Sequence, residues 1–284
     1  MAVTIERKCP ACGGACAPST IPGLLECGGC GFTTADVSLS RQELERLYSA
    51  AYFRGEEYRD YVGERALLTK QFQLRLETLL RYVPAARRQC LFEIGAAYGF
   101  FLDLARLHFD RVSGIDLSRD AGAYAREVVG VSVAAGDFLE HPLRGPVDAV
   151  CMWDTIEHLA QPALYIEKAA AHLRCGGVLA ITTGDIGSPL ARWRKEKWRQ
   201  IHPPSHLHYF SKHTLRLLLA KYGFEVCYEG YAGCYRSVDT IAYILLSLKR
   251  GRPGLYRKLK AAGLLNWSFY SNLYDILYVI ARKR

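Results

Sequence analysis

The segment richest in chemical information is residues 90–99, which read CLFEIGAAYG. The apolar run that includes Leu91 and Ile94 predicts a buried strand. Gly95 and Gly99 predict a tight turn into a helix. Because glycine has no Cβ, a ligand can approach the backbone of such a turn closely. The pattern therefore indicates a nucleotide-type binding loop, although it lacks the GxGxxG spacing of dinucleotide-binding proteins.

Two acids follow this loop, each at the end of a further predicted strand. Asp116 ends the apolar part of RVSGIDLS, where a carboxylate can accept hydrogen bonds from both hydroxyls of a ribose. Asp137 and Phe138 follow the next strand, in VSVAAGDFLE, where an adenine edge could lie. A fourth predicted strand, 147–153, leads into the polar loop DTIEHL. This order of strands and acids favours a nucleoside as the ligand.

Five segments, in this order, resemble class I S-adenosylmethionine-dependent methyltransferases: EIGAAYG, GIDLS, AGDF, VDAVCMWDTIEHLAQP and LRCGGVLAITT. The resemblance covers about residues 60–230. It implies an α/β, Rossmann-like fold with a seven-stranded, mostly parallel sheet whose last strand is antiparallel, and S-adenosylmethionine as the cofactor. The alternative is a generic Rossmann-like domain that binds NAD or no nucleotide. Ala97 stands where many relatives have glycine, and alanine is small enough to keep the turn.

The resemblance also assigns roles to residues around the loop. Glu93 would organise the glycine loop and the methionine amino group, and the loop backbone would approach the methionine part of the cofactor. The full set expected at the cofactor is Glu93, Gly95, Ala97, Gly99, Asp116, Leu117, Asp137, Phe138 and Trp153. For each acid in this set, an ordinary helix cap is the alternative.

Two CxxC pairs lie near the N-terminus, Cys9 with Cys12 and Cys27 with Cys30, and glycine follows each pair. Each pair forms a knuckle that turns two thiolates inward, and two knuckles complete a tetrahedral Zn²⁺ site. Because four thiolates leave no open position for water, the predicted zinc is structural rather than catalytic. A redox-active CxxC is the alternative, and Cys16 is a spare thiol that could replace a neighbour as ligand.

Three histidines are candidates for a catalytic base. A hydroxyl acceptor must lose its proton as the new bond forms, and a positioned histidine is the usual base. His158 follows the fourth strand, whereas His206 and His208 lie in a segment expected to cross over the pocket. A histidine that only hydrogen-bonds the backbone is the alternative for each. Asp154 and Glu157 share one face of a helical turn with His158 and, with a later histidine, could hold a divalent ion. This last arrangement resembles the metal site of small-RNA 2′-O-methyltransferases.

Composition and charge limit the classes of function. Half of the 284 residues are hydrophobic, which is typical of a globular chain. No apolar run of about 18 residues predicts a spanning helix, and the N-terminus lacks a signal core, so we expect a cytoplasmic protein. Residues 235–284 contain ten Lys or Arg and two Asp, a net +8 of the chain's +9. Such a basic end suggests an anionic partner, or simply a solvated face.

The chain divides into three expected parts. These are a zinc ribbon (1–36), a helical cap (37–88) and the methyltransferase domain (89–284), with acceptor-side insertions at 184–210 and 235–265. Helices are predicted over 40–53, capped at Ser40, over 64–82 and over 211–222, and a last strand at LYDILYVIARK. These flanks, with Asn272, Leu273 and Asp275, resemble a widespread bacterial group of zinc-ribbon-bearing methyltransferases, several of which act on sugars or secondary metabolites.

The leading hypothesis is methyl transfer to an oxygen of a small-molecule or glycan-type acceptor. The alternatives are an RNA 2′-O-methyltransferase and an inactive cofactor-binding scaffold. Nucleic acid is disfavoured because the positive charge lies in a late insertion and tail rather than along a groove. The basic segment 238–260 could contact a membrane surface, which would suit a lipid-linked sugar, or could pack on the core. The sequence predicts no oligomeric state.

Overall fold

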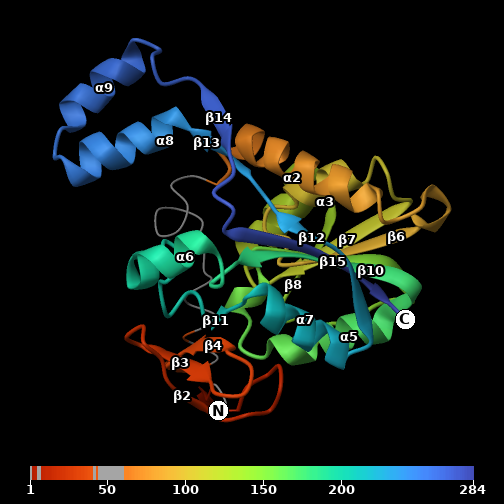
Figure 1. Cartoon of the computed structure of the whole chain (residues 1–284). Coiled ribbons are helices and arrows are strands. Elements are labelled where there is room, and N and C mark those ends of the chain that lie inside the picture. Colours follow the sequence, from red (N-terminus) through yellow and green to blue (C-terminus); the bar gives the residue numbers. More distant parts are fainter. Residues whose placement is uncertain (1, 5–7, 41–42, 44–60) are drawn as a thin grey trace.

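A seven-stranded sheet forms the centre of the molecule (Figure 1). The computed structural model describes residues 2–4, 8–40, 43 and 61–284. Along the sheet the strand order is β12-β15-β10-β9-β6-β7-β8. The strands are β6 (Cys90–Ile94), β7 (Arg111–Asp116), β8 (Ser132–Ala135), β9 (Val147–Trp153), β10 (Leu173–Gly184), β12 (Phe224–Tyr231) and β15 (Ile276–Lys283). β15 is antiparallel to both neighbours, so the predicted mostly parallel sheet with an antiparallel last strand is confirmed.

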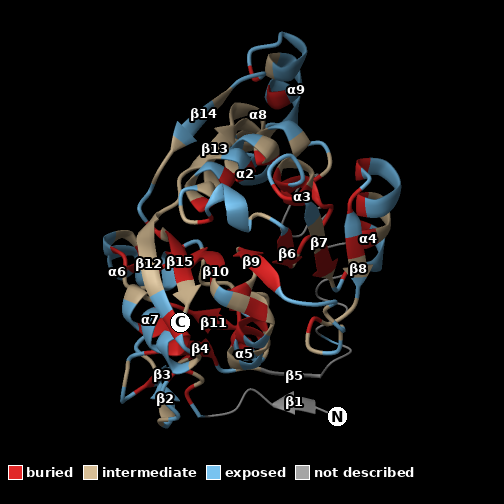
Figure 2. Ribbon diagram, turned by 90° about the vertical axis from the view of Figure 1, so that its right-hand side faces the viewer, coloured by how far each residue is buried: buried red, intermediate tan, exposed pale blue. Residues whose placement is uncertain are grey.

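Helices cover both faces of this sheet (Figure 1). One face packs against α2 (Arg65–Leu80), α3 (Phe100–Ala105) and α4 (Arg119–Tyr124), and the other against α5 (Pro162–His172) and α7 (Lys212–Lys221). Every residue of β6 and β9 is buried (Figure 2). Strands buried on both faces need continuous apolar runs, which is why these segments could be recognised in the sequence.

The two predicted helices before the sheet have different outcomes. The helix expected over 64–82 is α2, which buries Leu68, Phe72 and Leu76 against the sheet and α3. The helix expected over 40–53 falls mostly outside the described residues. Ser40, its expected cap, is the last residue of β5 (Ser38–Ser40), which pairs antiparallel with β1 (Ala2–Thr4).

The cysteine-bearing segment forms a small sheet of its own. Its strands are β2 (Cys16–Pro18), β3 (Leu24–Cys27), β4 (Thr33–Ala35) and β11 (His208–Tyr209), in the order β11-β4-β3-β2. β11 belongs to the segment between β10 and α7, so the N-terminal ribbon is joined to the main domain by strand pairing. In that pairing His208 lies opposite Thr34, and Thr34 Oγ1 donates a hydrogen bond of 2.9 Å to the carbonyl of Leu207.

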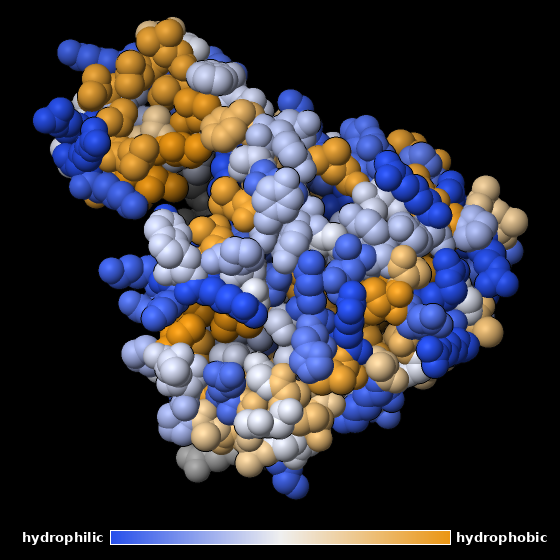
Figure 3. Space-filling view, viewed as in Figure 1, coloured by the Kyte–Doolittle hydropathy of each residue, from blue (hydrophilic) through white to orange (hydrophobic). Residues whose placement is uncertain are grey.

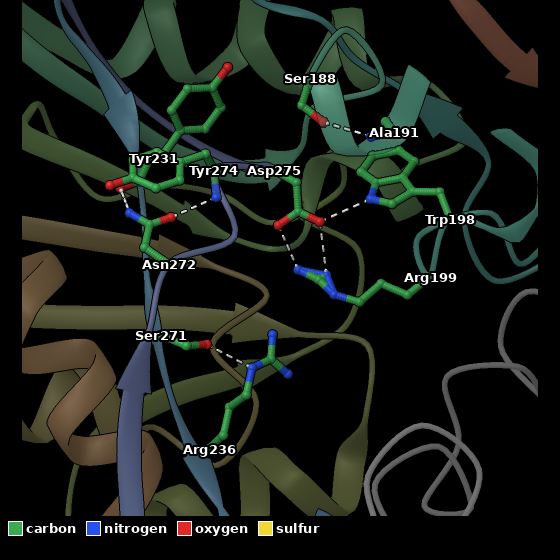
Figure 4. Close-up of polar contacts among 10 residues, drawn as sticks. All are labelled: Ser188, Ala191, Trp198, Arg199, Tyr231, Arg236, Ser271, Asn272, Tyr274 and Asp275. Carbon is green, nitrogen blue, oxygen red and sulfur yellow. Dashed lines mark hydrogen bonds and ion pairs between the residues drawn. The ribbon is translucent and has the colours of Figure 1, made fainter. Parts of the chain in front are cut away.

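An acid anchors the segment that runs from β10 to β11. Asp275 accepts hydrogen bonds from the Arg199 guanidinium at 2.9 and 3.2 Å and from Trp198 Nε1 at 2.9 Å (Figure 4). This segment also contains α6 (Pro189–Arg194). The sequence placed Asp275 inside the last strand, and this is wrong because β15 begins one residue later. The carboxylate sits in the preceding turn, where it can reach two side chains of another segment.

A projecting arm separates β12 from β15 (Figure 1). β13 (Cys234–Ser237) and β14 (Ser268–Ser271) pair antiparallel at its base. They carry α8 (Val238–Ala242), a π-helical stretch over Tyr243–Lys249 and α9 (Pro253–Ala261). Near the base, Thr240 Oγ1 donates a 2.7 Å hydrogen bond to Glu64 Oε1, beside α2. Across the described part of the chain, no helix has the length and apolar character needed to cross a bilayer.

Candidate active site

A pocket of about 770 Å³, counted to its open mouth, lies at the carboxyl ends of β6, β7 and β9. It is lined by Tyr61, Ile94, Gly95, Ala97, Ile115, Asp116, Leu117, Gly136, Phe138, Trp153, Asp154, Thr155, His158, Leu159 and Tyr165. Six of the nine residues that the sequence analysis assigned to the cofactor are therefore in this wall, and the other three, Glu93, Gly99 and Asp137, are not.

Asp116 connects the glycine loop to β7. Its Oδ2 accepts a 2.7 Å hydrogen bond from the Ala97 amide and its Oδ1 a 2.8 Å bond from the Ser118 amide. Ala97 has a φ of 44°, in the left-handed region, and the carboxylate holds this strained residue in place. Burial raises the pKa of Asp116, although these two hydrogen bonds oppose the shift. Each carboxylate oxygen keeps a second lone pair for a ligand.

The two glycines of the loop do different things. A Cβ on Gly95 would lie 2.5 Å from Oγ1 of Thr155, another residue of the pocket wall. A Cβ on Gly99 would lie 2.5 Å from Cγ2 of Val131, beneath the start of α3. Both glycines have a φ of 76°. Gly95 thus allows Thr155 to pack closely against the loop in the pocket wall, whereas Gly99 allows α3 to pack against the chain before β8.

The other two acids lie behind the pocket wall. Glu93 is buried at the end of β6, and burial, with the nearby charge of Asp116, raises its pKa well above the usual range. Among the described residues its Oε2 has no hydrogen-bond partner. Asp137 accepts hydrogen bonds from Tyr165 Oη at 2.6 Å and from the Leu139 amide at 2.8 Å. Asp137 therefore positions Tyr165, which does line the pocket.

Sequence reasoning missed three residues of this site, Tyr61, Arg75 and Tyr165. Arg75 reaches from α2 to Asp154, with an ion pair of 2.7 Å, and its guanidinium lies 5.6 Å from the centre of the Trp153 ring. Asp154 has a φ of 49°, an uncommon value for a residue other than glycine, and its amide is held by Thr182. No sequence signal marks Arg75, because only the packing of α2 brings it here.

The three candidate histidines occupy three different environments. His158 lines the pocket, and its Nδ1 is 2.8 Å from the carbonyl of Ser205. His206 is buried behind it, with ring centres 4.6 Å apart. His208 lies at the contact between the ribbon and the main domain, where its Nδ1 is 3.1 Å from Thr34 Oγ1. The structure brings only His158 to the pocket wall.

Burial decides the charge state of these groups. It lowers the pKa of His158 and of His208 to about 4, and it lowers the pKa of His206 further. The imidazoles are therefore neutral at pH 7. Glu157 is buried beside His158, and burial together with the charge of Asp154 raises its pKa to about 8. Glu157, His158 and His206 each offer one ligand atom within 4.8 Å of the others.

The cysteines fit a tetrahedral metal site. One sulfur from each of Cys9, Cys12, Cys27 and Cys30 lies within 4.8 Å of the other three. The Sγ atoms of Cys9 and Cys30 are 3.5 Å apart, and those of Cys12 and Cys27 are 3.4 Å apart. Tetrahedral zinc with bonds of about 2.3 Å places its sulfurs about 3.8 Å apart. Cys16 lies on β2 and is not one of the four.

A glycine turn after the first core strand, a buried acid after the second and a nucleoside-sized pocket between them define a ligand-binding Rossmann-like domain. The sequence matches the family described as methyltransferase domain over residues 65–229. This match spans more than half of the chain, which therefore belongs to that family. The chain therefore carries a methyltransferase domain with a Rossmann-like fold.

Solved structures share this fold at low sequence identity. Magnesium protoporphyrin IX methyltransferase from Synechocystis PCC 6803, with bound SAH, is 13% identical with a TM-score of 0.55, covering 86% of this chain and 100% of that one. The methyltransferase bound to the Haloferax volcanii activator Trm112 is 16% identical (TM-score 0.52; 78% and 94% covered). A Thermotoga maritima methyltransferase is 20% identical (TM-score 0.50; 78% and 91% covered). No curated protein matches the sequence.

Proposed function

We propose that this methyltransferase acts on a hydroxyl group of a small-molecule or glycan-type acceptor. The observation that supports this proposal is His158, a neutral imidazole in the same pocket wall as the glycine loop and Asp116. Because a carbonyl can only accept, the contact with Ser205 puts the proton on Nδ1 and leaves the lone pair on Nε2. A hydroxyl acceptor needs such a lone pair to receive its hydrogen bond and orient its oxygen.

The cofactor site rests on residues that fit a nucleoside. Asp116 would accept hydrogen bonds from the ribose hydroxyls, and Gly95 lies beside it in the pocket wall. Phe138 and Trp153 supply aromatic faces in the pocket wall. S-adenosylmethionine, when bound, supplies an already activated methyl group, so the protein's main contributions are alignment and exclusion of water. We also propose that the four cysteines hold a structural zinc ion.

His206 and His208 are not assigned to proton transfer in this proposal. His206 contacts the ring of His158 but does not line the pocket, and His208 hydrogen-bonds Thr34 of the ribbon. Their surroundings support structural or ligating roles.

The test compares transfer with cofactor binding in one variant. With labelled S-adenosylmethionine and a panel of sugars and phenols, we expect label in hydroxyl-bearing acceptors and none in total RNA. His158→Ala should abolish most of this transfer and leave S-adenosylhomocysteine affinity, measured by calorimetry, near the wild-type value. His213→Ala, on the outer helix α7, is the matched control. Full transfer by His158→Ala, or label in RNA or amines only, would contradict the proposal.

The arm supports a second partner, an anionic membrane surface. Large apolar side chains are exposed on it: Leu248 and Trp267 at 64% and Leu264 at 60%. Figure 3 shows apolar residues gathered over the arm with hydrophilic ones along its outer edge. Residues 238–260 contain six Lys or Arg and one Asp. Exposed apolar residues with basic neighbours suit lipid headgroups, whereas two arms of this charge would repel each other in a dimer.

Vesicle flotation tests this contact with the whole chain. We expect binding to vesicles that contain phosphatidylglycerol, none to neutral phosphatidylcholine vesicles, and loss of binding as salt rises. Trp267→Ala should weaken binding, and Leu107→Ala, which changes an exposed leucine near α3, should not. Absence of vesicle binding, or self-association that Trp267→Ala abolishes, would contradict a membrane partner.

A further inference from the structure

Behind the pocket wall, three potential metal ligands from two distant segments converge. Glu157 and His158 lie in a 3₁₀ turn after β9, and His206 lies just before β11. We propose that these three residues bind a divalent transition-metal cation at a site distinct from the four cysteines. Their ligand atoms all lie within 4.8 Å of one another.

Both imidazoles have their Nδ1 engaged by a backbone carbonyl. Nδ1 of His158 is 2.8 Å from the Ser205 carbonyl, and Nδ1 of His206 is 3.0 Å from the Gln200 carbonyl. A carbonyl has no proton to donate, so each Nδ1 carries the hydrogen and each Nε2 carries the lone pair. Metal-bound histidines commonly donate their second ring N–H to such a group, which fixes the tautomer and the ring orientation.

Glu157 supplies the third observation. Its side chain is 97% buried, and among the described residues Oε2 has no hydrogen-bond partner. A buried carboxylate oxygen normally has a partner, and a cation would provide one. The Glu157 carbonyl accepts a 2.9 Å hydrogen bond from the Leu207 amide, so the backbone itself ties the two ligand-bearing segments together.

The donor set indicates the class of metal. Two imidazole nitrogens and one carboxylate oxygen suit Zn²⁺, Co²⁺, Fe²⁺ or Mn²⁺, whereas Mg²⁺ and Ca²⁺ prefer oxygen ligands alone. Bonds of about 2.1 Å would place ligand atoms about 3.0–3.5 Å apart. Ligand atoms that lie within 4.8 Å of one another would have to move closer together, by side-chain rotation, to reach this separation.

The position of this site beside the pocket indicates a role for the cation in binding the acceptor. His158 is both a proposed ligand and part of the pocket wall, and three protein ligands leave coordination positions open. With the cation bound, the metal takes the Nε2 lone pair of His158, so the acceptor hydroxyl would meet the cation instead of Nε2. An acceptor hydroxyl bound at an open position would lose its proton more readily, because the cation stabilises the alkoxide. This last step rests on the proposed function, whereas binding of the cation does not.

Cobalt titration of the purified whole chain, with its cysteine site already loaded with zinc, tests the proposal. We expect one equivalent of Co²⁺ to bind beyond the zinc, with visible bands of nitrogen and oxygen ligation and no thiolate charge-transfer band. Glu157→Gln and His206→Gln should each weaken this binding at least tenfold. Asp120→Asn, the matched control, changes an acid in the first turn of α4, outside the group, and should leave this binding unchanged.

Each outcome decides the question. Absence of a second equivalent, thiolate bands only, or equal affinity in wild type and both folded variants would overturn the metal site. Far-ultraviolet circular dichroism checks the fold of each variant. S-adenosylhomocysteine calorimetry on the metal-free chain tests the cofactor site separately, so failure of one proposal leaves the other distinguishable.

Discussion

The two halves of the pocket are built in different ways. In the cofactor half, Gly95 and Asp116 each lie at or just after the end of the strand that positions them. The histidine half, made of Glu157, His158 and His206, joins a turn after β9 to a segment that follows β10. That segment depends on the ribbon through β11 and on Asp275 through Arg199. Local sequence therefore determines the first half, and long-range contacts determine the second.

Removal of a zinc ligand should separate the two halves most strongly. Cys27→Ser removes one of the four ligands and should lower the zinc content from one ion per chain to none. A structural zinc contributes about 10–16 kcal/mol to the folding of such a ribbon. The pairing of β4 with β11 should loosen with it. S-adenosylhomocysteine affinity should stay within about threefold of wild type, since distant sites act independently.

Metal analysis, calorimetry and hydrogen exchange at β11 check this expectation. Cys16→Ser, which changes a ribbon thiol outside the group of four, is the control and should keep its zinc. A large loss of cofactor affinity in Cys27→Ser would show that the halves are coupled.

The glycine loop provides the next contrast. Gly99→Ala should destabilise the fold, because the left-handed conformation costs an alanine about 1–2 kcal/mol and the added Cβ would press on Val131, a further cost of about 1–3 kcal/mol. Gly95→Ala has the same left-handed cost and would press on Thr155. Because Gly95 and Thr155 both line the pocket, this variant should in addition weaken S-adenosylhomocysteine binding, which Gly99→Ala should not. Thermal unfolding and calorimetry on both variants measure the two effects. Identical behaviour of the two variants would contradict the different roles.

Asp116 carries the largest single contribution expected in the cofactor half. Asp116→Ala removes charge-assisted hydrogen bonds worth about 1.5–3 kcal/mol, so S-adenosylhomocysteine affinity should fall at least about tenfold. Asp120→Ala, in the first turn of α4, is the control for loss of one negative charge nearby. An unchanged affinity in a folded Asp116→Ala chain would remove this residue from the cofactor site.

The sequence predicted the cofactor half of the pocket better than the histidine half. Buried parallel strands read as apolar runs, so the sheet and the loop after β6 could be located in advance. The sequence could not distinguish Gly95 from Gly99, because ligand approach and helix packing both exclude a Cβ. It also could not separate His206 from His208, since the partner strand of β11 comes from the N-terminal ribbon and leaves no local signal.

Side chains that reach the pocket from helices were the least predictable. Arg75 looks like any polar position of an amphipathic helix, and its contact with Asp154 exists only because α2 packs over the end of β9. Tyr165 lies on α5, which the sequence analysis did not connect to the pocket at all. Both contacts depend on helix placement, a tertiary property that a hydrophobic period does not encode.

The smallest expected effect concerns Tyr165. It shows whether Tyr165 or the carboxylate of Asp137 faces the cofactor beside Phe138. The hydroxyl of Tyr165 donates a 2.6 Å hydrogen bond to Asp137. Tyr165→Phe keeps the ring in the pocket wall and removes this bond, with a net contribution of about 0.5–1.5 kcal/mol. If Asp137 only positions Tyr165, S-adenosylhomocysteine affinity should fall less than about tenfold in Tyr165→Phe, and Asp137→Asn should have a similar effect. A much larger loss in Asp137→Asn than in Tyr165→Phe would mean that the carboxylate itself contacts the ligand.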